Sequence, residues 1–219
     1  MYYLYLFILL VAAYLSGSLN YAILITRAVR GRDIRELDSR NPGTANVFRN
    51  VGAAWGVLVG VLDALKSLAP LVLGRLLLFP GETYADYWAL FAAGMAAVLG
   101  HMKPVFYRFK GGGGLAAVLG LFVFFVPVEY IVSLIAGGVI VLTLMKNFSY
   151  KIGRWTPVMS VVLTPFAVLL SRAVVDIPLF AHLSIGGHPW YVVVGVFATS
   201  IFMLFMNLPF LIRTLKSSG

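Results

Sequence analysis

The stretch GHMKPVFYRFKGGGGLAAVLGLFVFF, residues 100–125, passes from basic and aromatic residues through four glycines into an unbroken apolar run. Apolar runs of this kind enter the lipid bilayer as helices, so a polar loop becomes a membrane helix at this point. Four consecutive glycines are an unusual entry into a helix, because glycine loses more backbone entropy on ordering than any other residue. The glycines therefore require a specific reason.

The composition of the whole chain agrees with a membrane environment. Of the 219 residues, 61% are hydrophobic and 11% are charged, whereas soluble domains carry about 25% charged residues. We expect an all-α integral membrane protein that forms a single polytopic membrane domain over residues 1–219. The chain has no cysteine, which excludes disulfides and thiolate metal sites. We expect neither a metal nor another cofactor.

Apolar runs predict about seven transmembrane helices. A helix needs roughly 20 apolar residues to cross a bilayer, and fewer where its neighbours distort the bilayer. The runs lie near residues 3–26, 51–79, 87–100, 115–129, 130–145, 156–174 and 190–212. Three of them are short, and the region 115–145 is also compatible with one long kinked element.

The segments between these runs alternate in charge. Most of the 17 basic residues fall into four segments, near 27–50, 101–114, 146–155 and the tail 213–219. The opposite segments carry no lysine or arginine and hold Glu82, Asp86, Glu129 and Asp176. The positive-inside rule then predicts an N-terminus outside the cell and a C-terminus in the cytoplasm. The net charge of +9 follows from this topology and from attraction to anionic headgroups, so membrane lipids rather than nucleic acid are the expected partners.

The first basic segment, RGRDIRELDSRNPGTANVFRNVG (residues 30–52), combines arginines with short polar residues. Asn46 and Arg49 are three positions apart and would share one face of a helix. The N-terminus of a helix favours an anion, because free backbone N–H groups and the positive end of the dipole meet there. An anion-binding loop is one interpretation. A solvated basic loop with a helix cap is the other.

The second basic segment places Lys110 directly before the glycines. Glycines let backbone N–H groups converge on an anion, and a basic side chain adds charge, so this pattern is typical of a phosphate cradle. It is not a P-loop, because the Lys-Ser/Thr pair that would follow at fixed spacing is absent. A flexible connector or a close-packed glycine face between helices would produce the same four residues.

Polar residues also occur inside the expected spans. Asp63 and Lys66 lie three positions apart in the second span, where charges are costly and usually paired or functional. Ser16, Ser18 and Asn20 form a polar patch near the end of the first span. This patch either makes hydrogen bonds between helices or lines a polar pocket.

Four stretches, taken in order, carry a resemblance to a known family. They are GSLNYA at 17–22, DSRNPGTANVFR at 38–49, LDALKS at 62–67 and GHMKPVFYRFKGGGGLAA at 100–117. On these stretches the chain resembles the bacterial acyl-phosphate:glycerol-3-phosphate acyltransferase family, whose members have seven spans, and looks like a divergent member of it. Gly113 stands where the family has a second lysine, and Asp38 and Arg40 replace two glycines. Only Asn207 is a counterpart of a His-Asn motif that the family carries after its last span.

The resemblance implies a reaction. An acyl group would pass from acyl phosphate to the 1-hydroxyl of glycerol 3-phosphate, giving lysophosphatidic acid and phosphate for phospholipid biosynthesis. The enzyme would be a multi-pass protein of the bacterial cell membrane, with its active site facing the cytoplasm. The acyl phosphate would be positioned by Ser39, Asn46 and Arg49. His101 would serve either as a base or as a structural hydrogen-bonding group.

A second set of residues is expected to complete the site, with Lys110 and the glycines after it on the phosphate of glycerol 3-phosphate. The residues expected to bind substrate phosphate are Asn41, Gly43, Lys110, Gly111, Gly112, Gly113 and Gly114. Supporting roles fall to Ser18, Asp63 and Lys66.

Two other functions remain open from the sequence. A divergent member of the family could bind lipid phosphates or acylate another polyol phosphate. A small membrane transporter is the alternative of a different class. Transporters place their substrate sites near the bilayer midplane, whereas the polar clusters of this chain are expected mainly at the cytoplasmic face.

Overall fold

The structure is a computed structural model that describes residues 1–81, 83–144, 148–175 and 188–216. The chain divides into two compact units, Met1–Phe125 and Val126–Gly219, and each is described by itself. Every regular element among the described residues is a helix. The expected all-α class is therefore confirmed, while the expectation of one polytopic domain stays a prediction.

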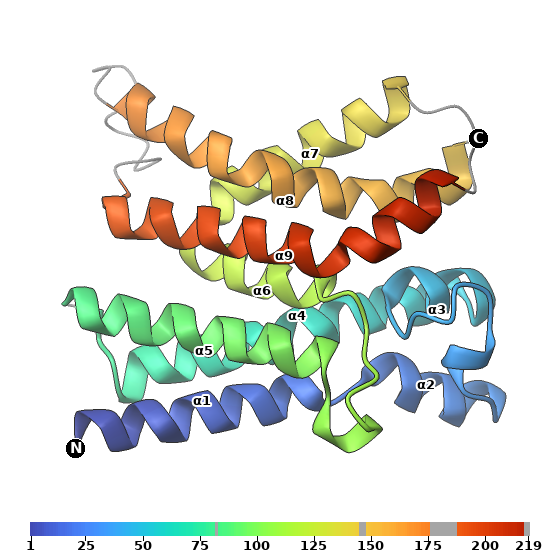
Figure 1. Ribbon diagram of the computed structural model, residues 1–219, viewed down its shortest axis with the longest axis horizontal. Helices are drawn as coiled ribbons and strands as arrows, with labels where there is room; N and C mark the ends of the chain where they lie inside the picture. The colour runs from blue at the N-terminus through green and yellow to red at the C-terminus, as the bar shows by residue number, and fades with distance from the viewer. Residues whose placement is uncertain (82, 145–147, 176–187, 217–219) are drawn as a thin grey trace. The chain divides into compact units, whose positions relative to one another are not determined.

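The first unit contains the two polar segments that the sequence singles out. Its longer helices α1, α4, α5 and α6 lie side by side, with the short helices α2 and α3 at one end (Figure 1). The helices of this unit are α1 (Tyr2–Ser18), α2 (Tyr21–Arg30), α3 (Thr44–Asn50), α4 (Ala53–Leu77), α5 (Tyr84–Met102) and α6 (Leu115–Phe125). Two 3-10 turns, η1 (Ile34–Glu36) and η2 (Val105–Tyr107), lie in its connections.

Six segments among the described residues are long and apolar enough to cross a membrane. They are Tyr2–Arg30, Ala53–Leu77, Tyr84–Tyr107, Pro127–Leu144, Trp155–Ala173 and Trp190–Pro209. The apolar helix Leu115–Phe125 occupies the position of the remaining predicted span but is shorter. The multi-span character is confirmed, and the count of seven and the orientation of the termini stay predictions.

The first expected span, 3–26, is interrupted after Ser18. Leu19 is extended, and the side chain of Asn20 accepts a hydrogen bond from the backbone N–H of Ile23 at 3.0 Å, which caps α2. Asparagine is a favoured N-cap residue because its side-chain oxygen satisfies a free N–H of the first helical turn. The break places the Leu19 carbonyl outside the helical pattern, where it accepts a hydrogen bond from Lys66 Nζ at 2.8 Å.

Close contact between α1 and α5 fixes the end of α5 against this break. A β-carbon added to Gly17 would lie 2.0 Å from the carbonyl oxygen of Ala97, and one added to Gly100 would lie 2.2 Å from that of Tyr14. The Tyr14 hydroxyl also donates a hydrogen bond to the Lys103 carbonyl at 2.8 Å. Small residues at such positions let helix backbones approach closely. The connection that follows α5 therefore begins at a fixed place beside α1.

The second unit consists of α7 (Pro127–Leu144), α8 (Phe148–Val175) and α9 (Trp190–Lys216). The expected boundary between spans at 129 and 130 is wrong, because α6 ends at Phe125 and proline, which suits the first position of a helix, begins α7. Glu129, expected in a connecting segment, is buried in the first turn of α7, and its Oε1 lies 2.9 Å from His188 Nε2.

Some of the expected polar segments fall on undescribed residues. Glu82, Asp176 and residues 146–147 of the third basic segment lie outside the described residues, and the backbone is helical from Phe148 onward. Of the tail 213–219, the backbone is described to Lys216 and its last three residues lie outside the described part.

Candidate active site

The connection between α2 and α3, residues 31–43 and here called the first loop, rests on a small apolar core. Ile34 is fully buried in it together with Ile23 of α2 and Val47 of α3. Asn46 is also buried, and its amide nitrogen donates to the backbone carbonyls of Ile34 at 3.2 Å, Leu37 at 3.0 Å and Asn41 at 3.0 Å. The amide of Asn46 thus holds the shape of the first loop from inside.

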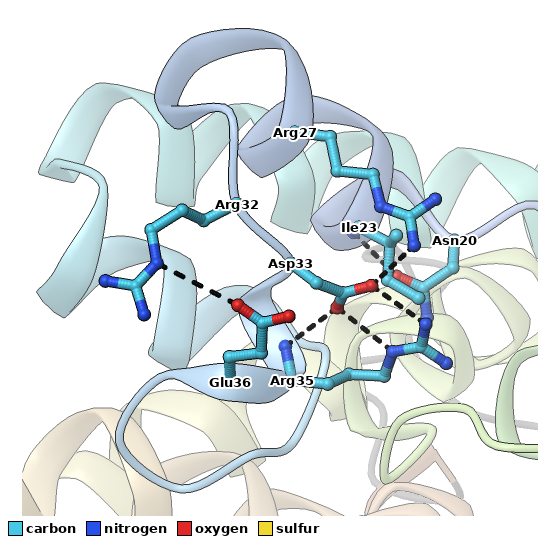
Figure 2. Close-up of polar contacts among 7 residues, drawn as sticks. All are labelled: Asn20, Ile23, Arg27, Arg32, Asp33, Arg35 and Glu36. Carbon is cyan, nitrogen blue, oxygen red and sulfur yellow. Dashed lines mark hydrogen bonds and ion pairs between the residues drawn. The ribbon is translucent and has the colours of Figure 1, made fainter.

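Asp33 joins the beginning of the first loop to α2. Its Oδ2 lies 2.7 Å from Arg27 Nη2 and 2.8 Å from Arg35 Nη2, and its Oδ1 accepts from the backbone N–H of Arg35 at 2.9 Å (Figure 2). The hydrogen bond from the Arg35 side chain, which outweighs the effect of burial, holds the pKa of the Asp33 carboxyl well below its usual range. The sequence predicts only topological charges at these arginines, so the Asp33 clamp, meaning the contacts of Asp33 with Arg27 and Arg35, is a finding of the structure.

Arg49 of α3 contacts the first loop through its side chain. Its Nε and Nη2 donate to the same oxygen, Oδ2 of Asp38, at 2.9 and 2.5 Å. The side chains of Arg49 and Asp38 are 26% and 31% exposed, so the pair lies at the surface of the loop. The predicted anion-binding arginine therefore already holds an anionic group of the chain itself.

A buried group of charged side chains lies beneath the loops. Lys66 Nζ lies 2.9 Å from Asp63 Oδ1, and His101 Nδ1 of α5 lies 3.7 Å from the same oxygen. Asp63 and Lys66 are 1% exposed and His101 is 3% exposed. The sequence predicted the pair on α4, and the structure adds His101, which only the packing of α5 brings there.

The same group stabilises the break between α1 and α2. Lys66 Nζ donates to the Leu19 carbonyl at 2.8 Å, and Ser16 Oγ donates to the Lys66 carbonyl at 2.9 Å. Ser18, expected in a supporting role, is buried, and its hydroxyl donates to the Tyr14 carbonyl one turn earlier at 2.8 Å. The polar patch of the first span therefore makes hydrogen bonds within and between helices.

The connection between α5 and α6, residues 103–114 and here called the glycine loop, packs its glycines against His101. A β-carbon on Gly111 would lie 2.1 Å from the His101 carbonyl oxygen, and one on Gly112 would lie 2.4 Å from His101 Nε2. The backbone N–H of Gly112 donates to the His101 carbonyl at 3.1 Å. The φ angle of Gly114 is +81°, a left-handed conformation that favours glycine.

These contacts supply a reason for three of the four glycines. Gly111 and Gly112 are required by the close approach to His101, and Gly114 by its backbone conformation. The N–H of Gly112, which was expected in the phosphate cradle, serves the fold of the loop itself. The remaining cradle residues stay predictions.

The two loops meet at the carbonyl oxygen of Pro42. Asn20 Nδ2 donates to this oxygen at 3.4 Å, and a β-carbon on Gly112 would lie 2.9 Å from it. The Arg35 guanidinium of the first loop also lies 5.9 Å from the ring centroid of Tyr107 in the glycine loop. Segments that are far apart in the sequence thus form one polar surface above the buried group of Asp63, Lys66 and His101.

The other predicted site residues lie around this junction. Lys110 is exposed, and Ser39, Asn41, Gly43 and Gly113 are partly buried. The Asn41 carbonyl accepts from the N–H of Gly43 at 3.0 Å as well as from Asn46. Among the residues that the structure describes, no three His, Cys, Asp or Glu side chains gather in a way that could hold a metal ion. The two loops thus carry two basic side chains, Arg49 and Lys110, and the hydroxyl of Ser39, while His101 is buried against the glycine loop.

Comparisons with known proteins extend over almost the whole chain. The family model described as glycerol-3-phosphate acyltransferase matches residues 7–214. The glycerol-3-phosphate acyltransferase of Anaeromyxobacter dehalogenans (strain 2CP-C) is 43% identical over 120 residues, 55% of this chain and 59% of the relative. That of Legionella pneumophila (strain Corby) is 37% identical over 167 residues, 76% of this chain and 56% of the relative. The matches thus span somewhat more than half the length of these relatives.

Solved structures agree with the fold. A crystal structure of PlsY (YgiH), an integral membrane glycerol 3-phosphate acyltransferase in its glycerol 3-phosphate form, is 27% identical with a TM-score of 0.76, covering 97% of this chain and 92% of that one. Its lysophosphatidic acid form is 28% identical with a TM-score of 0.71 and the same coverage. The resemblance that the motifs suggested is confirmed, and the chain belongs to the glycerol-3-phosphate acyltransferase family.

Proposed function

We propose that this chain transfers an acyl group from acyl phosphate to the 1-hydroxyl of glycerol 3-phosphate. The observation that carries the proposal is the meeting of the first loop and the glycine loop at Pro42, which places two anion-suited segments on one surface. The curated relatives are glycerol-3-phosphate acyltransferases, and the PlsY structures have glycerol 3-phosphate and lysophosphatidic acid forms. Both substrates are anions, which such a surface favours.

The acceptor binds at the glycine loop. Lys110 is exposed beside Gly111 and Gly112, so its ammonium group is free to reach the phosphate of glycerol 3-phosphate. His101 supports this loop from below through its carbonyl and its ring. We assign His101 to positioning the glycine loop, because both the imidazole and the backbone face the glycines.

The donor binds at the first loop. Arg49 offers a planar fork of N–H donors that matches phosphate, and Ser39 lies on the loop that Arg49 contacts through Asp38. Asn46 keeps the loop in shape, since its amide nitrogen is bound to three loop carbonyls. Arg49 and Ser39 stabilise the departing phosphate, and Asn46 acts as a positioning residue.

The chemistry is an acyl transfer between two oxygen atoms. The 1-hydroxyl oxygen attacks the acyl carbonyl carbon, a new ester C–O bond forms, and the C–O bond to phosphate breaks with its electron pair leaving on phosphate. The hydroxyl proton passes to the departing phosphate. Because acyl phosphate is already activated, positioning and stabilisation of charge supply most of the catalysis.

In this proposal, the site lies on the cytoplasmic side of a bacterial cell membrane. The two loops and their flanks are rich in arginine and lysine. The positive-inside rule assigns such segments to the cytoplasmic side. Nine basic residues lie there, namely Arg27, Arg30, Arg32, Arg35, Arg40, Arg49, Lys103, Arg108 and Lys110. The lipid product would remain in the membrane and enter phospholipid biosynthesis.

A product assay tests the proposal. The protein is purified in detergent and incubated with palmitoyl phosphate and glycerol 3-phosphate, and lysophosphatidic acid is measured by mass spectrometry. We expect the product only when both substrates are present. In Arg49→Ala, the rate of product formation should fall roughly 10- to 100-fold, the range for the loss of a hydrogen bond to a charged group. Arg32→Ala is the matched control, because that side chain is 62% exposed and lies 3.8 Å from Glu36.

The alternatives give different results in the same preparation. A lipid-phosphate-binding protein would bind glycerol 3-phosphate without forming product. A transporter would move radiolabelled glycerol 3-phosphate into proteoliposomes without chemical change. Either result, with no lysophosphatidic acid from folded protein, contradicts the acyltransferase proposal.

A further inference from the structure

The contact between Asp38 and Arg49 has the form of a bound anion. Two N–H donors of the guanidinium converge on one carboxylate oxygen, Asp38 Oδ2. Arginine binds a phosphate oxygen through the same fork of donors. Asp38 therefore occupies the face of Arg49 that a phosphate group would use.

Asp38 makes this contact from a backbone conformation that is unfavourable for most side chains. Its φ angle is 44°, in the left-handed region where glycine is the least strained residue. Asp tolerates this region better than most side chains but still at a cost. A glycine would fit the turn without strain, so the carboxylate is present at a cost to the local backbone and in contact with the predicted donor-binding arginine.

The ion pair between Asp38 and Arg49 is also partly exposed to water, so the two side chains can separate. Both side chains are about a quarter to a third exposed, and exposed ion pairs contribute little net stability because water competes for both charges. Asp38 belongs to the first loop, whereas Arg49 is anchored on α3. An incoming anion can replace the carboxylate without unfolding either element.

We propose that Asp38 is an internal competitor for Arg49 that the donor phosphate must displace. This inference rests on the proposed acyl-phosphate-dependent function. It makes Asp38 a determinant of affinity: the carboxylate weakens binding of acyl phosphate and returns to Arg49 as inorganic phosphate leaves. Because Arg49 is assigned to the donor phosphate and Lys110 to the acceptor, the effect is expected on the donor.

Asp38→Asn tests the inference, because asparagine keeps the shape and tolerates the left-handed conformation but carries no charge. We expect the KM for palmitoyl phosphate to fall about two- to fivefold, the size of an exposed ion pair. The KM for glycerol 3-phosphate should stay unchanged, and inorganic phosphate should inhibit more strongly. Glu36→Gln is the matched control, since it removes one negative charge from the same loop at a side chain that faces Arg32.

Further variants separate the competing explanations. Asp38→Gly should lower the KM for palmitoyl phosphate as Asp38→Asn does, which guards against a local effect of the asparagine amide. In the Arg49→Ala background, Asp38→Asn should change nothing. An equal gain in Glu36→Gln, or an unchanged donor KM in both Asp38 variants, overturns the inference while leaving acyl transfer in place.

Binding of inorganic phosphate, measured by calorimetry, keeps the inference testable if no variant turns over. If neither the wild-type protein nor any variant forms product, the proposed acyl transfer fails. A two- to fivefold tighter phosphate affinity in Asp38→Asn that requires Arg49 would still support internal competition. Equal phosphate affinity in wild type and Asp38→Asn would overturn it.

Discussion

His101 and Gly112 are in contact through both backbone and side chain. The N–H of Gly112 donates to the His101 carbonyl at 3.1 Å, and a β-carbon on Gly112 would lie 2.4 Å from His101 Nε2. The last turn of α5 thus serves as the surface on which the glycine loop folds. This contact links the loop to the buried Asp63 and Lys66, since His101 Nδ1 lies 3.7 Å from Asp63 Oδ1.

Gly112→Ala should disrupt the glycine loop. The added methyl group would collide with the His101 imidazole and the Pro42 carbonyl, and overpacking of this kind costs about 1–3 kcal/mol. We expect kcat/KM for glycerol 3-phosphate to fall about tenfold or more. Gly138→Ala is the control, because its β-carbon would lie 3.7 Å from Thr156 Cγ2, an ordinary contact. Equal activity in the two variants would show that the loop does not depend on this packing.

Lys66→Met should strongly destabilise the protein. The substitution leaves the Asp63 carboxylate buried without its cation and the Leu19 carbonyl without its donor. Removing one partner of a buried ion pair costs about 3–5 kcal/mol. Thermal unfolding in detergent measures the loss.

The double variant Asp63→Asn with Lys66→Met provides the check on that explanation. It removes both charges, so part of the stability should return. If the double variant is no more stable than Lys66→Met alone, the charge of Asp63 is not the cause of the destabilisation.

Asn46→Ala and Arg49→Ala should differ in their effects. Asn46→Ala removes the donors to three loop carbonyls, so we expect a loss of about 1–3 kcal/mol in stability together with lower activity. Arg49→Ala removes an exposed contact and should lower activity with a change in stability below about 1 kcal/mol. Unfolding temperature and donor KM are measured for both variants. A similar loss of stability in the two would refute the division between positioning and substrate contact.

The Asp33 clamp should make stability depend on acid pH. The pKa of Asp33 is lowered in the folded protein, so the clamp contributes fully above the ordinary aspartate pKa of about 3.9 and is lost as pH falls toward the folded value. Asp33→Asn should therefore lower the unfolding temperature at about pH 7, and the gap to wild type should narrow below about pH 4. A gap that stays constant over this range would contradict the clamp.

Much of the fold could be predicted from local sequence. Apolar runs located the membrane helices, because burial in lipid requires a nearly continuous apolar stretch. The run 115–145 was divided at the wrong point, although Pro127 carried the signal for a helix start. The break after Ser18 was missed, because an asparagine within an apolar run reads equally well as a polar side chain inside a continuous helix.

The candidate site could be predicted only in part. The spacing of Asp63 and Lys66 on one helix revealed their pairing, since residues three apart share a face. The approach of His101 to Asp63 and the meeting of Pro42 with Gly112 depend on how separate helices pack, which no local pattern encodes. The Asp38–Arg49 contact joins a left-handed loop residue to α3, and the sequence showed Asp38 only as a departure from glycine.

The most direct test of the proposed acyl transfer is a ³¹P NMR time course of the wild-type protein with palmitoyl phosphate and glycerol 3-phosphate. We predict that both substrate signals decrease together while lysophosphatidic acid and inorganic phosphate grow in a one-to-one ratio. Release of inorganic phosphate without lysophosphatidic acid, or no change in either substrate with folded protein, would contradict the account.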